Sequence, residues 1–315
     1  MIAFVLRRII GMIAVLFAVS VLTFVIFNVI PNGDPAIRMA GKNPTVTQVA
    51  GIRRDWDFDK PLPDQYVKMM QKVFSGDLIS YAQRDNVTDR IKQGLPKTIF
   101  LAVGAAFFML IGGIALGALS ALRPNSVADR VINAFAVTGI SMPVVCLGAI
   151  TSYYLGSKLH IFPAGGYVTI AQGGVGQWLY HLLLPCLVLA VLFIGIYSRV
   201  LRGDLVDALR SDHVRTARAK GLPERQVLIH HALRTALIPM VTLWGLDVGL
   251  LLGGGAVLTE SVFDLNGVGA YFAQSIASLD VPPVLEITLF GATVIVVLNT
   301  FIDILYAFLD PRIRL

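Results

Sequence analysis

A dense group of charged side chains lies in one polar stretch, residues 199–239, between two long apolar runs. The stretch carries eight Lys/Arg and four Asp/Glu residues. Because the flanking sequence is apolar, the stretch must face water, and short loops rich in Lys and Arg stay on the cytoplasmic side of a membrane. Either these charges only set the orientation in the membrane, or they also form a docking surface for a soluble partner.

The polar stretch has the pattern of two short helices joined by a tight bend. Residues 212–220 begin with Asp212 and end in cations, as the helix dipole favours. Gly221 is a natural stop, because glycine tolerates the left-handed conformation that follows a last helical turn. Pro223 and Glu224 suit the first turn of a second helix. The apolar residues of that helix recur about three or four apart, at Val227, Leu228, Ala232 and Leu233.

Asp247 and Glu286 are acidic residues within apolar runs. A charge near mid-membrane costs ~3 kcal/mol or more, so Asp247 should face a cavity or a partner. It either shares a hydrogen bond with a neighbouring helix or lines a transport path, and both interpretations remain open. Beside it, glycines recur every four residues and make one smooth helix face, at Gly245, Gly249 and Gly253.

The motifs of common active sites are absent from the sequence. No G-x-x-x-x-G-K-[ST] loop occurs, so the chain has no such site for ATP, and neither H-E-x-x-H nor G-x-S-x-G is present. The five histidines do not form a ligand set, and Cys146 and Cys186 lie in apolar segments, as small buried hydrophobes do. We therefore predict a non-catalytic chain with no metal site and no cofactor of its own.

Composition indicates an all-α integral membrane protein. Of 315 residues, 56% are hydrophobic and 15% charged, and the mean hydropathy is +0.72. Apolar runs of about 20 residues indicate transmembrane helices. The net charge of +6 does not indicate nucleic-acid binding, because the cations cluster beside apolar runs, where they set topology. Six spans are predicted: residues 9–30, 99–122, 131–156 with a kink at Pro143, 178–197 broken by Pro185, 236–258 and 284–309.

Charge also predicts the topology and the division of the chain. The predicted cytoplasmic segments hold fourteen Lys/Arg, and the two short outer loops hold one, Lys158. Both termini should therefore be cytoplasmic, with an uncleaved first span in residues 1–30. Residues 31–96 form an extracytoplasmic cap with short helices near 46–54 and 63–73. Residues 97–315 form a five-helix core with a cytoplasmic loop at 199–236, and a further short helix is expected near 268–276.

Several sequence blocks resemble one family of bacterial permeases. Arg215-Thr216-Ala217 and Gly221 stand where the cytoplasmic "EAA" loop of ABC-importer permeases has Glu-Ala-Ala and Gly. The string R-T-A-R-A-K-G-L resembles the dipeptide/oligopeptide/nickel branch of that family. So do P-N-G-D-P, with Asn32 as an insertion, and L-T-E-S-V-F…N-G-V-G, with Asn266 where the family has Pro. The last block is I-D-I-L-Y-A-F-L-D-P-R-I-R.

The resemblance implies one permease subunit of a type I ABC importer in a bacterial or archaeal inner membrane, with an extracytoplasmic insertion between helices 1 and 2. The implied partners are a second homologous permease, two ATP-binding subunits that carry ATP and Mg²⁺, and an extracytoplasmic substrate-binding protein. The cargo is a dipeptide, an oligopeptide or a related molecule, with nickel, glutathione and sugars left open. The predicted ATPase-coupling residues are Asp212, Arg215, Thr216, Ala217, Lys220, Gly221, Leu222, Pro223 and Glu224.

Proteins of other classes remain as alternatives. An ion-coupled secondary transporter would use Asp247 and Glu286 as proton relays, although inverted repeats with broken helices are not evident. A membrane enzyme or a scaffold is a weaker alternative, because the sequence shows no catalytic set and a scaffold would leave the cost of Asp247 unexplained.

Overall fold

The computed structural model describes residues 2–30, 33–41 and 44–309, and the regular structure of these residues is helical. The predicted all-α class is therefore confirmed. The chain divides into two compact units. Unit 1 comprises Met1–Ile99, Gly249–Ser261 and Leu265–Leu315, and unit 2 comprises Phe100–Val248 and Val262–Asp264. Asn32 and the final D-P-R-I-R of the last sequence block lie outside the described residues.

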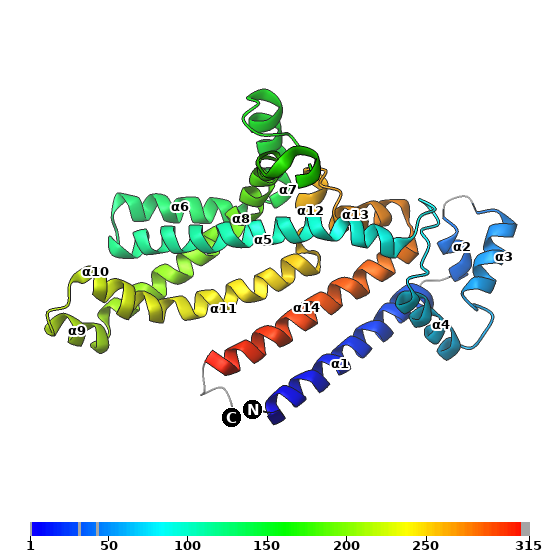
Figure 1. The fold of residues 1–315 in the computed structure, drawn as a ribbon, viewed down its shortest axis with the longest axis horizontal. Helices are drawn as coiled ribbons and strands as arrows, with labels where there is room; N and C mark the ends of the chain where they lie inside the picture. The colour runs from blue at the N-terminus through cyan, green and yellow to red at the C-terminus, as the bar shows by residue number, and fades with distance from the viewer. Residues whose placement is uncertain (1, 31–32, 42–43, 310–315) are drawn as a thin grey trace. The chain divides into compact units, whose positions relative to one another are not determined.

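Unit 1 is built on two long helices that lie side by side, α1 (Ile2–Phe24) and α14 (Val281–Leu309) (Figure 1). A π-helical turn, η1 (Val25–Val29), extends α1. The first part of α5 (Val87–Leu122), η4 (Leu251–Gly255), α12 (Val257–Val262) and α13 (Val268–Ser278) complete the unit. The predicted helix at 268–276 is confirmed by α13.

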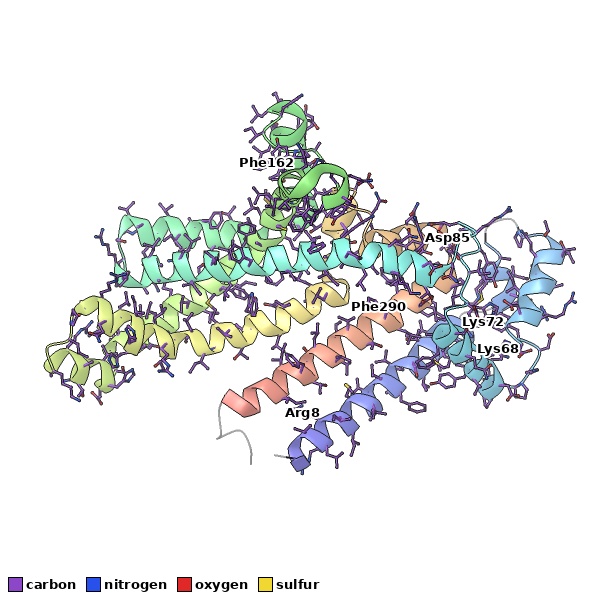
Figure 2. The ribbon with its side chains drawn as sticks, viewed as in Figure 1. Arg8, Lys68, Lys72, Asp85, Phe162 and Phe290 are labelled. Atoms are coloured by element: carbon purple, nitrogen blue, oxygen red, sulfur yellow. The ribbon has the colours of Figure 1, made fainter. Side chains whose placement is uncertain are left out.

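The cap between the first two spans is helical, as predicted. It contains α2 (Pro35–Met39), α3 (Val46–Asp55) and α4 (Leu62–Ser75). Trp56 is buried in its core and donates from Nε1 to the Tyr81 hydroxyl at 2.9 Å. Lys72 on α4, labelled in Figure 2, lies 5.6 Å from the Trp56 ring centre and 2.8 Å from Asp55.

Unit 2 is built around α8 (Ile170–Arg210), whose backbone is interrupted near its start by a kink at Gly174 (φ 71°, ψ 175°). Helices α6 (Val127–Ser141) and α7 (Val144–Thr151) pack on it, followed by the π-helical η2 (Ser152–Lys158). After α8 come α9 (Asp212–Ala219), α10 (Glu224–Gln226), η3 (Val227–Leu233) and α11 (Arg234–Leu250) (Figure 1).

Glycine lets α5 and α8 approach closely within unit 2. A Cβ added to Gly113 would lie 2.6 Å from the Tyr197 Cβ, and one added to Gly117 would lie 2.9 Å from the Leu201 Cβ. Small residues allow such contacts between helices in lipid, where apolar burial alone gives little attraction.

Two predictions about prolines in the spans differ from the structure in degree or in kind. The kink expected at Pro143 in residues 131–156 is a sharp bend, because α6 and the α7–η2 helix meet at 104°, which makes this segment either one broken span or a re-entrant loop. Met142 between them is extended (ψ 123°), since the residue before a proline avoids the helical conformation. Pro185 was expected to break the fourth span, but α8 continues through it, as membrane helices often do when neighbouring groups satisfy the freed carbonyl. Five helices are long and apolar enough to cross a membrane, or six if the bent pair counts as one span.

Candidate functional site

The predicted coupling segment forms two short helices with a bend at Gly221. Helix α9 ends there in a Schellman motif, in which Gly221 N–H donates to the Arg218 carbonyl and Leu222 N–H to the Ala217 carbonyl. Gly221 has φ +78°, a conformation that L side chains rarely adopt. The predicted stop at Gly221 is therefore confirmed. We call residues 212–224 the elbow.

The second half of the elbow leads into η3, and η3 packs against α9. Val214 and Ala217 from α9 are buried, as are Val227 and Ala232 from η3, and the two elements are in contact. Arg218 donates to both carboxylate oxygens of Glu224, at 2.5 and 3.2 Å, and so bridges the bend. This pair is solvent-exposed, so it orients the bend but adds little stability.

Most of the predicted coupling residues are exposed on the elbow. Asp212, Arg215, Thr216, Lys220, Gly221, Pro223 and Glu224 are exposed, and Leu222 is half-buried. Arg215 lies 3.2 Å from Asp212, one turn earlier. Ala217 differs, because it is 4% exposed and packs inward. Its side chain therefore supports the elbow from beneath rather than offering a contact surface.

An ion-pair network that the sequence did not predict lies in the same unit. Arg202 on α8 donates to Asp129 on α6 through Nε and Nη2, both at 2.7 Å. The Asp129 carboxylate also accepts hydrogen bonds from the Ser120 hydroxyl, the Asn125 backbone N–H and the Asn133 side-chain amide. Asp129 is 3% exposed, so its charge is buried and fully paired. The network joins α5, α6 and α8 eight residues before α8 ends at the elbow.

The structure gives Asp247 a partner. The Tyr197 hydroxyl on α8 donates to Asp247 Oδ2 at 2.7 Å. This is the helix-pairing role that the sequence left open for Asp247. Two of the predicted small-face glycines also pack within the chain: a Cβ on Gly249 would lie 3.3 Å from Asn299, and one on Gly253 would lie 2.2 Å from Ile295. Gly245 is half-buried.

Glu286 is 7% exposed and accepts a hydrogen bond from Thr88 at 2.7 Å. It belongs to unit 1, whereas Asp247 belongs to unit 2. Among the described residues, no group of three or more His, Cys, Asp or Glu side chains is placed to hold a metal ion.

Two family signatures together cover almost the whole chain. Residues 113–315 match the "Binding-protein-dependent transport system inner membrane component", and residues 1–102 match the "Binding-prot-dependent transport system membrane comp, N-term". The chain belongs to this family. The permease has the apolar helices that such an inner-membrane component requires.

Relatives of the permease align with it over nearly their full length. It is 34% identical to the probable peptide ABC transporter permease protein y4tP of Sinorhizobium fredii, with 99% of each chain covered. It is 37% identical to the probable D,D-dipeptide transport system permease protein DdpB of Escherichia coli, covering 96% of this chain and 95% of the relative. It is 35% identical to the glutathione transport system permease protein GsiC of Pectobacterium atrosepticum, covering 100% and 99%.

These matches make the permease a multi-pass membrane subunit of an ABC importer, working with other components of such a transporter. The ion-coupled secondary transporter is not favoured. One family difference has a visible result: Asn266 has φ +53°, which proline, fixed near −65°, cannot adopt. The loop before α13 therefore turns differently from one that has proline at this position.

Proposed function

We propose that this permease forms half of the translocation pore of an ATP-driven importer for dipeptides or oligopeptides. A second homologous permease completes the pore, and an extracytoplasmic substrate-binding protein delivers the cargo. Two ATP-binding subunits, which hold ATP and Mg²⁺, dock on the elbow, and the permease itself is non-catalytic. It spans a bacterial or archaeal inner membrane with both termini in the cytoplasm.

The coupling step follows from the helices that meet at the elbow. Helix α8 ends at Arg210, directly before α9, and η3 continues into α11. Both α8 and α9 contact η3, so a push on the elbow moves the ends of α8 and α11 together. Rigid-body movement of packed helices is how alternating access proceeds in many transporters. The Asp129–Arg202 pair would transmit the movement from α8 to α6.

The observation that carries the proposal is the similarity along the whole chain to permeases with peptide cargoes. The three relatives are named as permeases for a peptide, a D,D-dipeptide and glutathione, which is itself a short peptide. The exposed cations and acids of the elbow support docking, because complementary charges steer and orient a protein partner.

The docking role is tested by replacing Gly221 with valine. A β-branched residue at φ +78° is strained by about 1–2 kcal/mol or more, so the Schellman motif should open and the elbow should lose its shape. We expect Gly221→Val to abolish cargo-stimulated ATP hydrolysis by the assembled importer while leaving the amount of inserted permease unchanged.

The matched control is Gly203→Val on α8. Gly203 is exposed, its φ is not positive, and no atom lies within 4 Å of an added Cβ. This variant should keep normal ATP hydrolysis. Normal stimulation in Gly221→Val would refute the docking role.

A further inference from the structure

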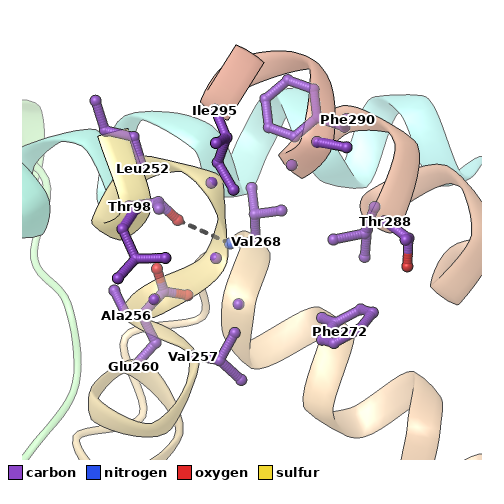
Figure 3. Close-up of a pocket in the computed structure, with 18 residues that line it drawn as sticks. Thr98, Leu252, Ala256, Val257, Glu260, Val268, Phe272, Thr288, Phe290 and Ile295 are labelled. Atoms are coloured by element: carbon purple, nitrogen blue, oxygen red, sulfur yellow. Dashed lines mark hydrogen bonds between the residues drawn. The ribbon is translucent and has the colours of Figure 1, made fainter. Parts of the chain in front are cut away.

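A cavity of about 460 Å³ lies in unit 1 among η4, α12, α13 and α14 (Figure 3). Its volume is within the range of small-molecule pockets, about 300–1,000 Å³. Most of its wall is apolar, with Leu252, Phe272, Phe290 and Ile295 among the lining residues. Such a cavity accepts a small apolar body.

Backbone rather than side chains forms one wall of the cavity. A Cβ on Gly291 would lie 2.4 Å from the Gly253 carbonyl oxygen, so α14 and η4 touch through their main chains. Gly254 has φ +126°, which interrupts the helix at this wall. The main chains of α14 and η4 therefore form this wall directly.

Glu260 is a fully buried acid on the cavity wall. Its Oε2 accepts the Ala270 N–H of the first turn of α13 at 3.0 Å. Its Oε1 is buried and has no hydrogen-bond partner among the described residues. Burial raises the pKa of the Glu260 carboxyl. Hydrogen bonds from Thr98 and from the Ala270 and Gly269 backbone amides, together with the positive charge of Lys97, oppose that effect. A buried polar atom left without a partner is costly.

The other polar side chains on the wall already have partners. The Thr98 oxygen accepts the Val268 N–H at 3.0 Å, drawn as the dashed line in Figure 3. The Thr288 hydroxyl donates to the Val284 carbonyl at 2.6 Å. Nearby Lys97 donates to the Asn266 carbonyl at 3.0 Å. The cavity therefore offers a ligand one unsatisfied side-chain acceptor, Glu260 Oε1, in apolar surroundings.

We propose that this cavity binds a primary ammonium group attached to a small apolar body, with Glu260 Oε1 as its acceptor. A peptide whose first residue is apolar presents this chemistry at its amino terminus. A cation fits better than a neutral donor, because a buried carboxylate is stabilised most by an opposite charge that also donates hydrogen bonds. Assigning the ligand as cargo rests on the importer function proposed above.

Binding of an amine probe tests the cavity itself. The probe is phenylalaninamide, compared with 3-phenylpropanamide, which lacks only the amino group, on the assembled importer in lipid nanodiscs. The Glu260→Gln variant keeps an acceptor for the Ala270 N–H but carries no charge. We expect it to weaken phenylalaninamide binding about tenfold or more, as for a lost hydrogen bond to a charged group, and to leave 3-phenylpropanamide within about twofold.

The control variant is Thr259→Val, on the same helix. Thr259 is 1% exposed, does not line the cavity, and its hydroxyl has no partner among the described residues. Thr259→Val should leave the affinities for phenylalaninamide and 3-phenylpropanamide unchanged. Equal loss of both probes in Glu260→Gln would mean that Glu260 only holds α13. Undiminished phenylalaninamide binding in Glu260→Gln would mean that Glu260 is not the acceptor of the amine, and no binding to the wild-type importer would mean that the cavity does not take this ligand. Either result overturns the proposal.

Uptake then separates the cavity from the importer function. The uptake rate of a free-amine dipeptide is divided by that of its desamino analogue, once for Glu260→Gln and once for the wild type. The first ratio is then divided by the second. Because the same substrate-binding protein serves both importers, its own preference for one peptide cancels in this quotient. A tenfold fall in this quotient would show that the cavity binds cargo. Amine binding without any peptide uptake by the wild type would refute the proposed cargo and leave the cavity assignment standing. Amine binding with an unchanged ratio would show that the ligand is not cargo and overturn that part of the proposal.

Discussion

Asp129 binds Arg202 in a bidentate pair, and the rest of its carboxylate is satisfied by Ser120, Asn125 and Asn133. Paired acceptors and donors of this geometry are among the strongest polar contacts in proteins. The sequence alone did not predict this pair, because its two members lie 73 positions apart. Local pattern carries no signal for such a pair.

The Asp129–Arg202 pair should stabilise unit 2 as one coupled contact. Removing one member of a buried pair leaves the other charge uncompensated and costs about 3–5 kcal/mol, here at the lower end because the Arg202 side chain is 30% exposed. We expect Asp129→Asn and Arg202→Gln each to destabilise the purified permease by about 3 kcal/mol in thermal or denaturant unfolding.

The double variant should cost no more than the larger single one, because both changes remove the same contact. Strictly additive losses would show that the two side chains act independently.

Asp247 pairs with Tyr197, and this contact predicts a mild phenotype. An asparagine can accept the same hydrogen bond from the Tyr197 hydroxyl through its amide oxygen. Asp247→Asn should therefore keep ATP-driven uptake within about twofold of the wild type, since a retained hydrogen bond preserves its contribution of about 1 kcal/mol. A proton relay needs a titratable group, so abolished uptake in this variant would favour the ion-coupled mechanism.

At the scale of helices, the elements that sequence predicted best are those specified by local signals. In the elbow, one helix begins at Asp212 and ends before Gly221, and the next begins after Pro223. These ends depend on the chemistry of single turns, and so do the ends of the cap helices. The bend between α6 and α7 was expected only as a kink at Pro143. Its size of 104° depends on the helices against which α7 packs. Whether a helix continues through a proline such as Pro185 likewise depends on neighbouring groups rather than on the local sequence.

The site in unit 1 was also beyond local signals. Glu260 satisfies the first turn of α13 from another helix, and the glycines around it allow that approach. A Cβ on Gly267 would lie 2.3 Å from Glu260 Oε2. The sequence presented T-E-S-V-F and N-G-V-G as two separate blocks, and only the fold brings the acid of one to the glycines of the other.

Packing of α5 on α8 predicts opposite effects for the same substitution at two glycines. At Gly113 an added methyl meets Tyr197 and Met240 at under 3 Å, whereas at Gly11 on α1 nothing lies within 4 Å. Gly113→Ala should destabilise the permease by about 1–3 kcal/mol through overpacking.

Gly11→Ala should be neutral or stabilising by up to ~1 kcal/mol, because alanine favours the helix. The free energies of unfolding of the two variants, measured in the same detergent, test this difference. Equal effects of the two substitutions would contradict the close α5–α8 contact.

At the scale of the whole molecule, function was predictable because it is spread over many blocks of sequence. Hydropathy indicated the membrane, the missing catalytic motifs argued against an enzyme, and the strings around Thr216 and Glu260 indicated the family. The position of each helix end and the partner of each buried acid required the fold. The orientation in the membrane rests on the charge asymmetry and remains a prediction.

The central claim is that the elbow faces the cytoplasm and receives the ATP-binding subunits. Thr216 is exposed at the middle of α9, so Thr216→Cys, in a chain with Cys146 and Cys186 replaced by serine, places a single thiol on the proposed contact surface. In the assembled importer this thiol should cross-link to an ATP-binding subunit, in a yield that changes between nucleotide-free and ATP-bound states. Labelling of the same thiol by an impermeant reagent added outside intact cells would contradict the account.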